Sequence, residues 1–430
     1  MKNWAGNYTY RARVIHEPTG LDELREIVAR TPRLKVFGSR HSFNDISDTS
    51  GELLSLARMP PVFGLDRDRL TLTVHAGARY GDISEPLAQA GFALANLGSL
   101  PHISVAGAVA TATHGSGRHL QSLASSVAGM TLVTPAGELA TFERGNAEFD
   151  GAVVSLGALG VVVEVTLVVE PAYDVRQWVF NDLPLAEFEK RFEEISALGY
   201  SVSFFSDWRK PTIDQLWIKQ RVDRDTSGSD DRVASRELFG ATAAAVDQHP
   251  IRYMSAAACT PQRGVPGAWH ARLPHFRMDH TPSAGAELQS EYLVSRADAI
   301  PAFEALRSLS ERLARLVQVT EMRTIAADPL WLSPAYERDT AAIHFTWLPD
   351  WPSVRAILPD VEALLRPFEP RPHWGKLFAM DAAEVRARYA RADDFTALVS
   401  DLDPTGKFTN EFVARYVTAA SSDDDRPTPR

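Results

Sequence analysis

The first third of the chain alternates strand patterns with helix patterns. Apolar residues dominate "RLKVFG" (33–38), and they alternate with polar residues in "LTLTVHAGA" (70–78), as is typical of β-strands. "TGLDELREIVAR" (19–30) and "YGDISEPLAQAG" (80–91) repeat apolar residues at helical spacing, with Thr19 as a candidate N-cap of the first helix. That helix is expected to bury Leu21, Leu24, Ile27 and Val28. Strands joined by helices indicate a mixed α/β layer structure.

A different pattern begins near residue 172, where Trp, Phe and charged residues become more frequent. Alternating polar and apolar residues predict strands in "SVSFFSDWRK", "QLWIKQRV", "EMRTIAA" and "AAIHFTWL". "AIPAFEALRSLSERLARLVQ" (299–318) predicts one amphipathic helix, and a similar helix is expected over roughly 353–368. These elements indicate a second domain of the α+β class.

The length of the chain also favours two domains. Its 430 residues exceed the roughly 250 to 300 at which one hydrophobic core usually stops growing. The predicted segments are a first domain 1–172, a second domain 173–375, a C-terminal segment 376–418 that returns to the first domain, and a disordered tail 419–430. The polar stretch "DRDTSGSDDRVASRE" (223–237) is expected to form a solvated loop.

Charge and composition exclude several classes of protein. Forty-five Lys and Arg against 55 Asp and Glu give a net charge of −10 without a long basic run, so nucleic acid is not an expected partner. No run approaches the ~18 apolar residues of a membrane span, and the start "MKNWAGNYTY" lacks the apolar core of a signal peptide. The single cysteine, Cys259, can form no intrachain disulfide. We expect a cytoplasmic monomer without nucleic-acid or membrane partners.

Two glycine- and serine-rich stretches are candidate ligand-binding segments. In "VFGSRHSFND" (36–45), His41 follows a Gly-Ser-Arg tripeptide at the point where the preceding strand must end. "NLGSLPHISVAGAVATATHGSG" (96–117) has few bulky side chains, so its backbone N–H groups could approach and bind an anion such as a pyrophosphate. A structural run of small residues is the alternative for the second stretch. The small residues concerned are Gly98, Ser99, Ser104, Gly107, Thr113, Gly115 and Ser116.

The order of these motifs resembles that of a known flavoprotein family. "VFGSRHSF", "LPHISVAGAVATATHGSG", "GALGVVVEVTL", "PHWGK" and "GKFTNEF" follow one another, and the likeness runs from "NWAGN" to "KFTN". A Rossmann site is excluded, because no G-x-G-x-x-G opens a helix after a strand in the first domain. The sequence is similar to the vanillyl-alcohol-oxidase-type flavoproteins, and within them to the alditol (xylitol) oxidases, with the sugar-lactone oxidases as cousins. The resemblance implies an α+β, two-domain PCMH-type FAD-binding fold whose substrate (cap) domain is an antiparallel sheet with helices.

The resemblance also implies a covalent FAD cofactor, with the ring of His41 joined to the 8α-methyl group of the flavin. An electron-withdrawing imidazolium at this position is expected to raise the reduction potential of the flavin. Many relatives have glycine at the position of Arg40, so it stays open whether Arg40 contacts phosphate or points to solvent. The cofactor-binding residues that the resemblance implies are Gly38, Ser39, Arg40, His41, Ser42, Ser99, Ser104, Gly107, Thr113, Gly115, Ser116, Val162 and His373.

Pairs of polar residues on predicted strands are the candidate catalytic groups. Glu321 and Arg323 are two residues apart, as are His344 and Thr346, and strand spacing puts the members of each pair on one face. A surface ion pair is the alternative for a lone Glu-x-Arg. "PHWGK" adds His373 and Lys376. The resemblance implies that Ser104, Glu321, Arg323, Thr346 and Lys376 bind and convert a polyol, with His344 nearby.

The implied reaction oxidises a primary hydroxyl through the flavin, and molecular oxygen becomes hydrogen peroxide. Negative charge develops as the hydroxyl loses its proton, so the cations Arg323 and Lys376 are expected to lower the barrier. Either Lys376 or His344 could be the base, and the sequence does not decide between them. The other members of the set would hold the remaining hydroxyls of a linear polyol such as xylitol or sorbitol, and ligands without those hydroxyls would bind less well.

Two other functions remain as alternatives. One is a sugar-1,4-lactone oxidase or dehydrogenase of the same fold, and the other is a flavin-fold binding protein without activity. The stretch "WHARLPHFRMDH" (269–280) contains three histidines, but their spacing is not that of a zinc site, so a structural role is expected and no metal is predicted. The motifs encode neither the preferred polyol length nor oxidase-versus-dehydrogenase behaviour.

Overall fold

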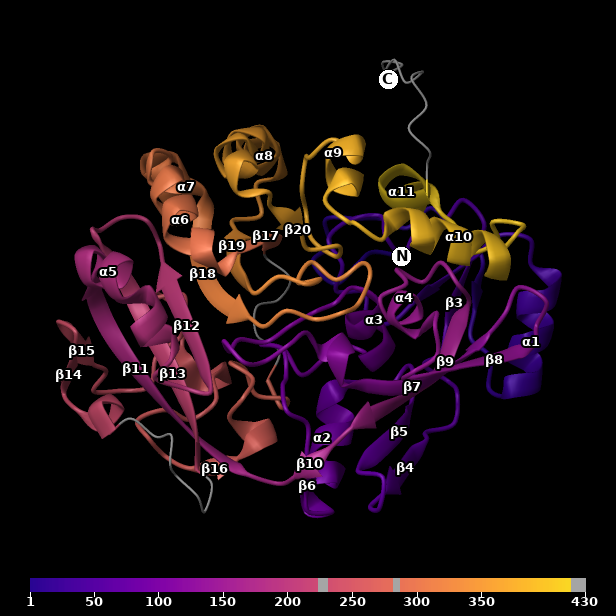
Figure 1. The fold of residues 1–430 in the computed structure, drawn as a ribbon, viewed down its shortest axis with the longest axis horizontal. Helices are drawn as coiled ribbons and strands as arrows, with labels where there is room; N and C mark the ends of the chain where they lie inside the picture. The colour runs from indigo at the N-terminus through magenta and orange to yellow at the C-terminus, as the bar shows by residue number, and fades with distance from the viewer. Residues whose placement is uncertain (223–230, 281–286, 419–430) are drawn as a thin grey trace.

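The computed structural model describes residues 1–222, 231–280 and 287–418. The predicted tail 419–430 and residues 223–230 of the predicted loop lie outside the described residues. The rest of that loop forms a short 3-10 helix, Asp231–Ala234, and ends where strand β14 begins. Figure 1 shows the two main parts of the chain, one built around a small sheet and the other around a large sheet.

The chain begins with a small parallel sheet and a helix. Strands β1 (Ile15–His16), β3 (Glu52–Ser55) and β2 (Leu34–Phe37) pair in that order, and helix α1 (Leu21–Arg30) buries Leu24, Ile27 and Val28 as expected. Two details of the predicted helix are wrong. The N-cap is Gly20, and Thr19 instead donates its N–H and hydroxyl to the Glu23 carboxylate. Leu21 is not buried, because 36% of the residue is exposed.

A five-stranded antiparallel sheet forms the core of this first part. Its order is β4-β5-β9-β7-β8, with helices α2, α3 and α4 beside it (Figure 1). Strand β9 alternates buried and half-buried residues, because one face of the strand lies on the hydrophobic core. The bounds are β4 Phe63–Asp66, β5 Thr71–His75, α2 Tyr80–Gln89, α3 Val105–Ala110, β7 Val127–Val133, β8 Leu139–Glu143, α4 Phe149–Val153 and β9 Val161–Val168. A short pair, β6 (Phe92–Ala93) with β10 (Glu170–Pro171), lies at its edge.

The second part is a large antiparallel sheet of order β14-β15-β11-β13-β12-β18-β19-β17-β20, with β16 (Gly267–Ala268) paired to β11. The predicted strands at 201–210, 215–222, 321–327 and 341–348 are confirmed as parts of β12, β13, β18 and β19. The bounds are β11 Asp174–Pro184, β12 Ser201–Ser206, β13 Thr212–Val222, β14 Glu237–Leu238, β15 Ala241–Ala243, β17 Leu288–Ser295, β18 Val317–Ile325, β19 Thr340–Trp347 and β20 Arg371–Pro372. The change from β9 to β11 falls near residue 172, and the domain boundary predicted there stays a prediction.

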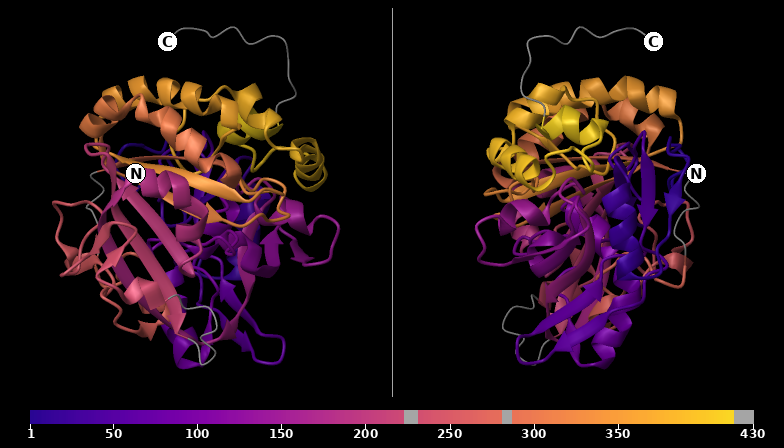
Figure 2. Two further views of the ribbon diagram at one scale, coloured as in Figure 1. Left: turned by 60° about the vertical axis from the view of Figure 1, so that its left-hand side comes forward. Right: turned by 90° about the vertical axis from the view of Figure 1, so that its right-hand side faces the viewer.

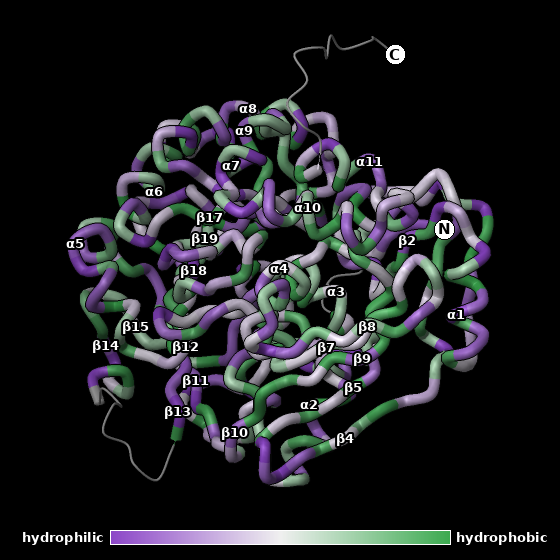
Figure 3. The backbone as a smooth tube through the Cα atoms, turned by 45° about the vertical axis from the view of Figure 1, so that its right-hand side comes forward, coloured by the Kyte–Doolittle hydropathy of each residue, from purple (hydrophilic) through white to green (hydrophobic). Residues whose placement is uncertain are grey.

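Helices cover the outer face of the large sheet. They are α5 (Leu185–Ser196), α6 (Ala299–Arg307), α7 (Ser310–Leu316) and α8 (Trp351–Leu365), and Figure 3 shows hydrophilic residues gathered on α5 at the surface. The single helix predicted over 299–318 is wrong. Its chain breaks after Arg307, where the Ser308 hydroxyl donates to the carbonyl of Ala305 and competes with the helical pattern. The β-branched Val317 and Val319 then begin β18.

The C-terminal segment lies along the top of the molecule in Figure 2, which also shows α8 in the same layer. Its helices are α9 (Ala382–Ala387), α10 (Ala392–Leu402) and α11 (Glu411–Val413). This segment contacts the start of the chain. Asn410 donates its amide N–H groups to the carbonyls of Ile46 and Asp48 at 2.9 and 2.8 Å. Among the described residues, none of the helices has the length and apolar character needed to cross a membrane.

Candidate active site

A cavity of about 590 Å³ lies between the two parts of the molecule. One wall is the His41 loop (residues 38–43), which follows strand β2, and a second wall is formed by residues 98–114. The third wall comes from the inner face of strands β17, β18 and β19 together with residues 373–376. The cavity therefore brings together the motifs that the sequence analysis selected from distant parts of the chain.

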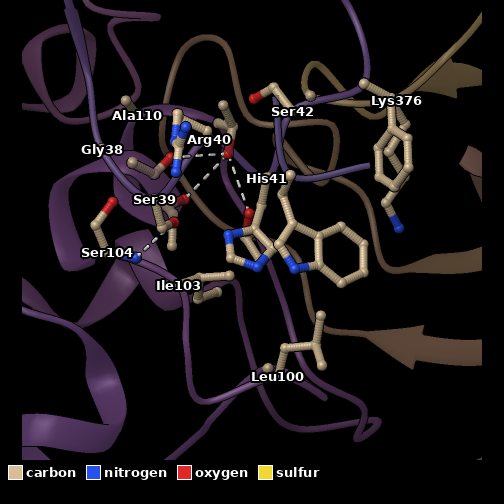
Figure 4. Close-up of a pocket in the computed structure, with 18 of the residues that line it drawn as sticks. Gly38, Ser39, Arg40, His41, Ser42, Leu100, Ile103, Ser104, Ala110 and Lys376 are labelled. Carbon is tan, nitrogen blue, oxygen red and sulfur yellow. Dashed lines mark hydrogen bonds between the residues drawn. The ribbon is translucent and has the colours of Figure 1, made fainter. Parts of the chain in front are cut away.

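The His41 loop is held closely against residue 104. The Ser104 N–H donates to the Ser39 hydroxyl at 3.1 Å, and a Cβ atom on Gly38 would lie 2.1 Å from the Ser104 hydroxyl oxygen. Glycine is therefore required at position 38. Figure 4 shows His41 between Gly38 and Ser104 on one side and Lys376 on the other. Ser104 is thus in contact with the predicted cofactor loop, and its predicted contact with substrate stays a prediction.

The His41 side chain has the properties expected of a nucleophile. Its Nδ1 is buried in the cavity wall and has no hydrogen-bond partner within the described chain. Burial, with smaller contributions from the neighbouring His102 and Arg40, lowers the pKa of the imidazole to about 4, although the backbone of Ser39 opposes the shift. The ring is therefore neutral at pH 7. One nitrogen of a neutral imidazole carries a free lone pair, and an unpartnered Nδ1 fits that description.

The question about Arg40 has a structural answer. Its guanidinium donates to the carbonyl of Lys2 at 3.2 Å in an exposed contact, although the residue also lines the cavity. Its backbone has a φ of 61°, in the left-handed region that glycine adopts without strain. Such a backbone conformation favours glycine at position 40. Arg40 lies at the mouth of the cavity.

Most of the predicted residues in the second stretch line the cavity. They are Gly98, Ser99, Ser104, Gly107 and Thr113, with Val162 and His373 nearby. Gly115 and Ser116 are not among the residues that line the cavity, and their predicted role in cofactor binding stays a prediction. The Ser116 hydroxyl donates instead to the carbonyl of Val202. A Cβ atom on Gly115 would lie 2.2 Å from the Asn96 side chain, so glycine is required there by packing.

The strand register aligns the polar side chains of the third wall. His344 on β19 lies directly opposite Glu321 on β18 and directly opposite Glu291 on β17. Thr346, two residues further along β19, lies directly opposite Gln289 on β17. Neighbouring strands are about 4.8 Å apart, which explains why these side chains reach one another. The members of each predicted pair, Glu321 with Arg323 and His344 with Thr346, line the same cavity, so the shared face that the two-residue spacing predicted is confirmed.

Glu291 is the centre of this polar cluster, and sequence reasoning missed it. Its carboxylate accepts from Arg323 Nη2 at 2.7 Å and from Lys376 Nζ at 2.5 Å. It also lies 3.4 Å from His114 Nε2 and 3.7 Å from His344 Nδ1. Only 1% of the residue is exposed. The signal was available, because Gln289 and Glu291 in "LQSEYLVS" have the same two-residue spacing as the pairs that were selected.

Charges inside the cluster set its protonation states. Burial alone would raise the pKa of Glu291, but Lys376 and Arg323 outweigh it and hold that pKa well below its usual range. Burial lowers the pKa of Lys376, while Glu291 opposes the shift. Burial together with Lys376 lowers the pKa of His344 to about 4, so this imidazole is neutral at pH 7. Lys376 Nζ lies 2.6 Å from His344 Nδ1, and His344 Nε2 lies 3.0 Å from the Thr346 hydroxyl.

A second layer of polar residues supports Glu321. His275 Nε2 lies 3.0 Å from a Glu321 carboxylate oxygen, and His275 Nδ1 lies 3.2 Å from Lys219 Nζ. The ionised Glu321 carboxylate only accepts, so the Nε2–H of His275 donates to it, and Nδ1 of this neutral ring accepts from Lys219. Burial lowers the pKa of Lys219 to about 7. His275 belongs to the histidine-rich stretch for which only a structural role was expected, and it too lines the cavity.

The cavity fits FAD better than it fits a metal ion. No group of three or more metal-ligating side chains occurs in the described ranges of the chain. Small residues along two walls leave backbone N–H groups close to the cavity, and His41 lines the same space. Ser39, Ser42, Gly107 and Thr113 are the described residues that would hold the cofactor, with His41 beside its ring system.

Comparison with known proteins decides the family. Residues 12–143 match the model of the FAD binding domain, and residues 285–416 match that of D-arabinono-1,4-lactone oxidase. The chain is 47% identical over 414 residues to an alditol oxidase from Streptomyces sp., a match that covers 96% of this chain and 97% of the relative. The chain belongs to the alditol oxidase family. The predicted resemblance and the predicted FAD-dependent oxidoreductase class are confirmed.

Other relatives are more distant in sequence. An L-gulono-1,4-lactone dehydrogenase from Mycobacterium tuberculosis is 27% identical over 425 residues, covering 96% of this chain and 98% of the relative. The crystal structure of cholesterol oxidase from B. sterolicum matches with a TM-score of 0.75 at 16% identity, covering 97% of this chain and 96% of that one. At that identity the match shows the fold alone, and it confirms the predicted PCMH-type α+β fold.

Proposed function

We propose that this protein oxidises the terminal primary hydroxyl of linear polyols such as xylitol or sorbitol. The products are the aldose and hydrogen peroxide, because the two hydrogens removed from the polyol pass to molecular oxygen. The observation that carries the proposal is the wall of aligned polar side chains on β17, β18 and β19, which lies in the same cavity as His41. The 47% identity to an alditol oxidase supports it.

The polar wall offers more hydrogen-bonding groups than a single reacting hydroxyl can use. Glu321, Thr346 and Arg323 line the cavity from two adjacent strands. A carboxylate accepts from hydroxyls, a guanidinium donates to them, and a threonine hydroxyl does either. A ligand with several hydroxyls satisfies these buried groups, whereas a simple alcohol leaves them unpaired at a cost in free energy.

Bound FAD supplies the hydride acceptor in this proposal, and the side chains of the chain handle the proton and the charge. Arg323 is a buried cation on the cavity wall, where it would stabilise negative charge on the reacting oxygen, and the partly buried Lys376 would add to this effect once it has taken up a proton. The hydrogen bonds of His344 occupy both of its ring nitrogens. Lys376 has a pKa lowered by burial and borders the cavity directly, so we assign the first proton acceptor to Lys376.

The substrate range tests the proposed function. We expect xylitol and sorbitol to exceed glycerol in kcat/KM by about tenfold or more, because each added hydrogen bond contributes about 1 kcal/mol, or about 1.5 to 3 with a charged partner, and 1.4 kcal/mol is a factor of ten. The measurement is the rate of flavin reduction without oxygen, followed by peroxide release in air. Glu321→Gln should narrow the polyol advantage and leave the flavin in place.

The same panel separates the alternatives. Ethanol serves as the control that lacks additional hydroxyls, and a sugar 1,4-lactone tests the activity named for the relatives at lower identity. Faster bleaching of the flavin by the lactone than by xylitol would replace the polyol assignment with the lactone one. A purified protein that binds no FAD would support a binding protein without activity.

His41 is proposed as the covalent anchor of the flavin. The purified protein should be yellow, and the colour should stay with the polypeptide after acid precipitation. In His41→Ala the flavin should move entirely to the supernatant, because the neutral and unpartnered Nδ1 is the proposed attachment atom. Measuring flavin absorbance in both fractions checks this, and covalent flavin in the variant would contradict the assignment. Cytoplasmic location, the monomeric state and the domain boundaries stay predictions from the sequence.

A further inference from the structure

The N-terminal clamp, defined as residues 2–8, holds the backbone of the His41 loop. The Trp4 N–H donates to the carbonyl of Arg40 at 2.8 Å. The side-chain amides of two asparagines donate to backbone carbonyls further along the loop. Asn3 Nδ2 donates to the carbonyl of Ser42 at 2.9 Å, and Asn7 Nδ2 donates to that of Phe43 at 2.8 Å. Backbone groups on both sides of His41 are therefore fixed by the clamp.

The clamp is itself braced by internal hydrogen bonds. Asn3 Oδ1 accepts from the Tyr8 N–H at 3.0 Å, and Asn3 Nδ2 also donates to Asn7 Oδ1 at 2.7 Å. Gly6 makes the turn between them with a φ of +72°, which glycine adopts without strain. Tyr8 donates its hydroxyl to Asp48 at 2.6 Å. This bracing explains what the "NWAGN" stretch does, a motif that the proposed function leaves unused.

Trp4 reaches from the clamp to the imidazole. Its indole stacks on the ring of His41 with centroids 5.0 Å apart and planes 24° apart. Both side chains line the cavity. The stack covers one face of the imidazole and limits rotation of the ring, while Nδ1 keeps no hydrogen-bond partner among the described residues. The stacking thus favours one orientation of the ring, and no hydrogen bond engages its Nδ1.

We propose that the N-terminal clamp positions His41 for covalent attachment of the flavin, with Trp4 as the positioning residue. This inference rests on the proposed anchor role of His41. In the attachment, the imidazole loses its N–H hydrogen, the 8α-methyl group loses one hydrogen, and an N–C bond joins the two. The two hydrogens removed pass to molecular oxygen, giving hydrogen peroxide, so oxygen is the oxidant. Bond formation needs the reacting atoms about 3 to 3.5 Å apart and aligned, which a freely rotating imidazole rarely satisfies.

The test compares rates of covalent attachment in the full-length chain. Protein produced in flavin-depleted cells is mixed with FAD in air, and flavin fluorescence on denaturing gels is followed with time. Trp4→Leu should attach flavin roughly two- to tenfold more slowly, the range that the loss of one aromatic pair implies. Trp4→Phe keeps a ring and should restore most of the rate. Trp351→Leu is the matched control, because Trp351 is 42% exposed and lies outside the cavity lining, and it should attach flavin at the parent rate.

Further variants separate the possible failures. Asn7→Ala keeps Trp4 but removes the hydrogen bond to the carbonyl of Phe43, so it should also slow covalent attachment. This variant tests the clamp if Trp4→Leu does not fold. Attachment at the parent rate in both Trp4→Leu and Asn7→Ala would overturn the clamp while the His41 anchor stands. A parent protein that carries no covalent flavin would overturn the anchor and the clamp together. Failure of Trp4→Phe to recover any rate in a folded protein would also count against the stacking role.

Discussion

Replacing Lys376 with alanine is expected to slow flavin reduction by xylitol about 10²-fold or more. The ammonium group lies in the cavity wall, 2.5 Å from Glu291 and 2.6 Å from His344. Removing one stabiliser of developing charge from a shielded site typically costs this much in rate, and the variant also loses the proposed proton acceptor. Stopped-flow absorbance of the flavin without oxygen measures the effect.

The control for this prediction is Lys210→Ala. Lys210 is an exposed lysine whose ammonium pairs with Asp182 at 3.1 Å, so its loss should leave the rate unchanged within a factor of two or so, as is usual for surface ion pairs. The absorbance spectrum of the oxidised flavin should be the same in both variants. A Lys376→Ala rate within a few-fold of the parent would mean that the lysine does not contact the reacting hydroxyl.

Replacing Glu291 with glutamine should lower the free energy of unfolding by about 3 to 5 kcal/mol. The physical reason is that the buried Arg323 and the partly buried Lys376 both pair with this carboxylate, so that its loss leaves Lys376 without a carboxylate partner and Arg323 with Glu321 alone. Because the folded-state pKa of Glu291 is depressed, its stabilising effect is complete above the ordinary glutamate pKa of about 4.3 and declines as the pH falls through the folded-state value. Urea unfolding at pH 7 and at lower pH measures the effect.

Glu411→Gln is the matched control for Glu291→Gln. Glu411 pairs with Arg11 at the surface, where its side chain is 57% exposed, so the expected loss is at most about 1 kcal/mol. Equal losses in the two variants would show that Glu291 is no more important than a surface carboxylate. Since Glu291 raises the pKa of Lys376, Glu291→Gln should also move the pH dependence of flavin reduction to lower pH.

The sequence predicts side chains that share a face of one strand better than it predicts which strands are neighbours. Glu321 with Arg323, and His344 with Thr346, follow from the two-residue repeat of a strand. The pairing of His344 with both Glu321 and Glu291 depends on the order of three strands, which no local pattern contains. Glu291 was overlooked for that reason, although its own strand has the same alternation.

The errors in the fold have a similar origin. The helical periodicity of 299–318 is real, but the Ser308 side chain interrupts the helix and the end of the segment pairs as β18. Ser116 has the composition of a ligand-binding loop, yet Val202 from the distant strand β12 takes its hydroxyl. The pairing of β18 with β12 and β19 and the Ser116–Val202 bond are contacts between distant parts of the chain, and such contacts become visible only in the folded structure.

The hydrogen bonds from Asn410 to the carbonyls of Ile46 and Asp48 bear on the order of events during synthesis. Domains usually fold as they leave the ribosome, beginning at the N-terminus, but here the segment directly after the His41 loop depends on a side chain more than 360 residues later. Gly375 adds a second such contact, because its carbonyl accepts from the N–H of Phe43 at 2.8 Å. The cofactor loop therefore reaches its final conformation only after residues 375 and 410 have been synthesised, so FAD cannot meet a finished loop on a shorter nascent chain.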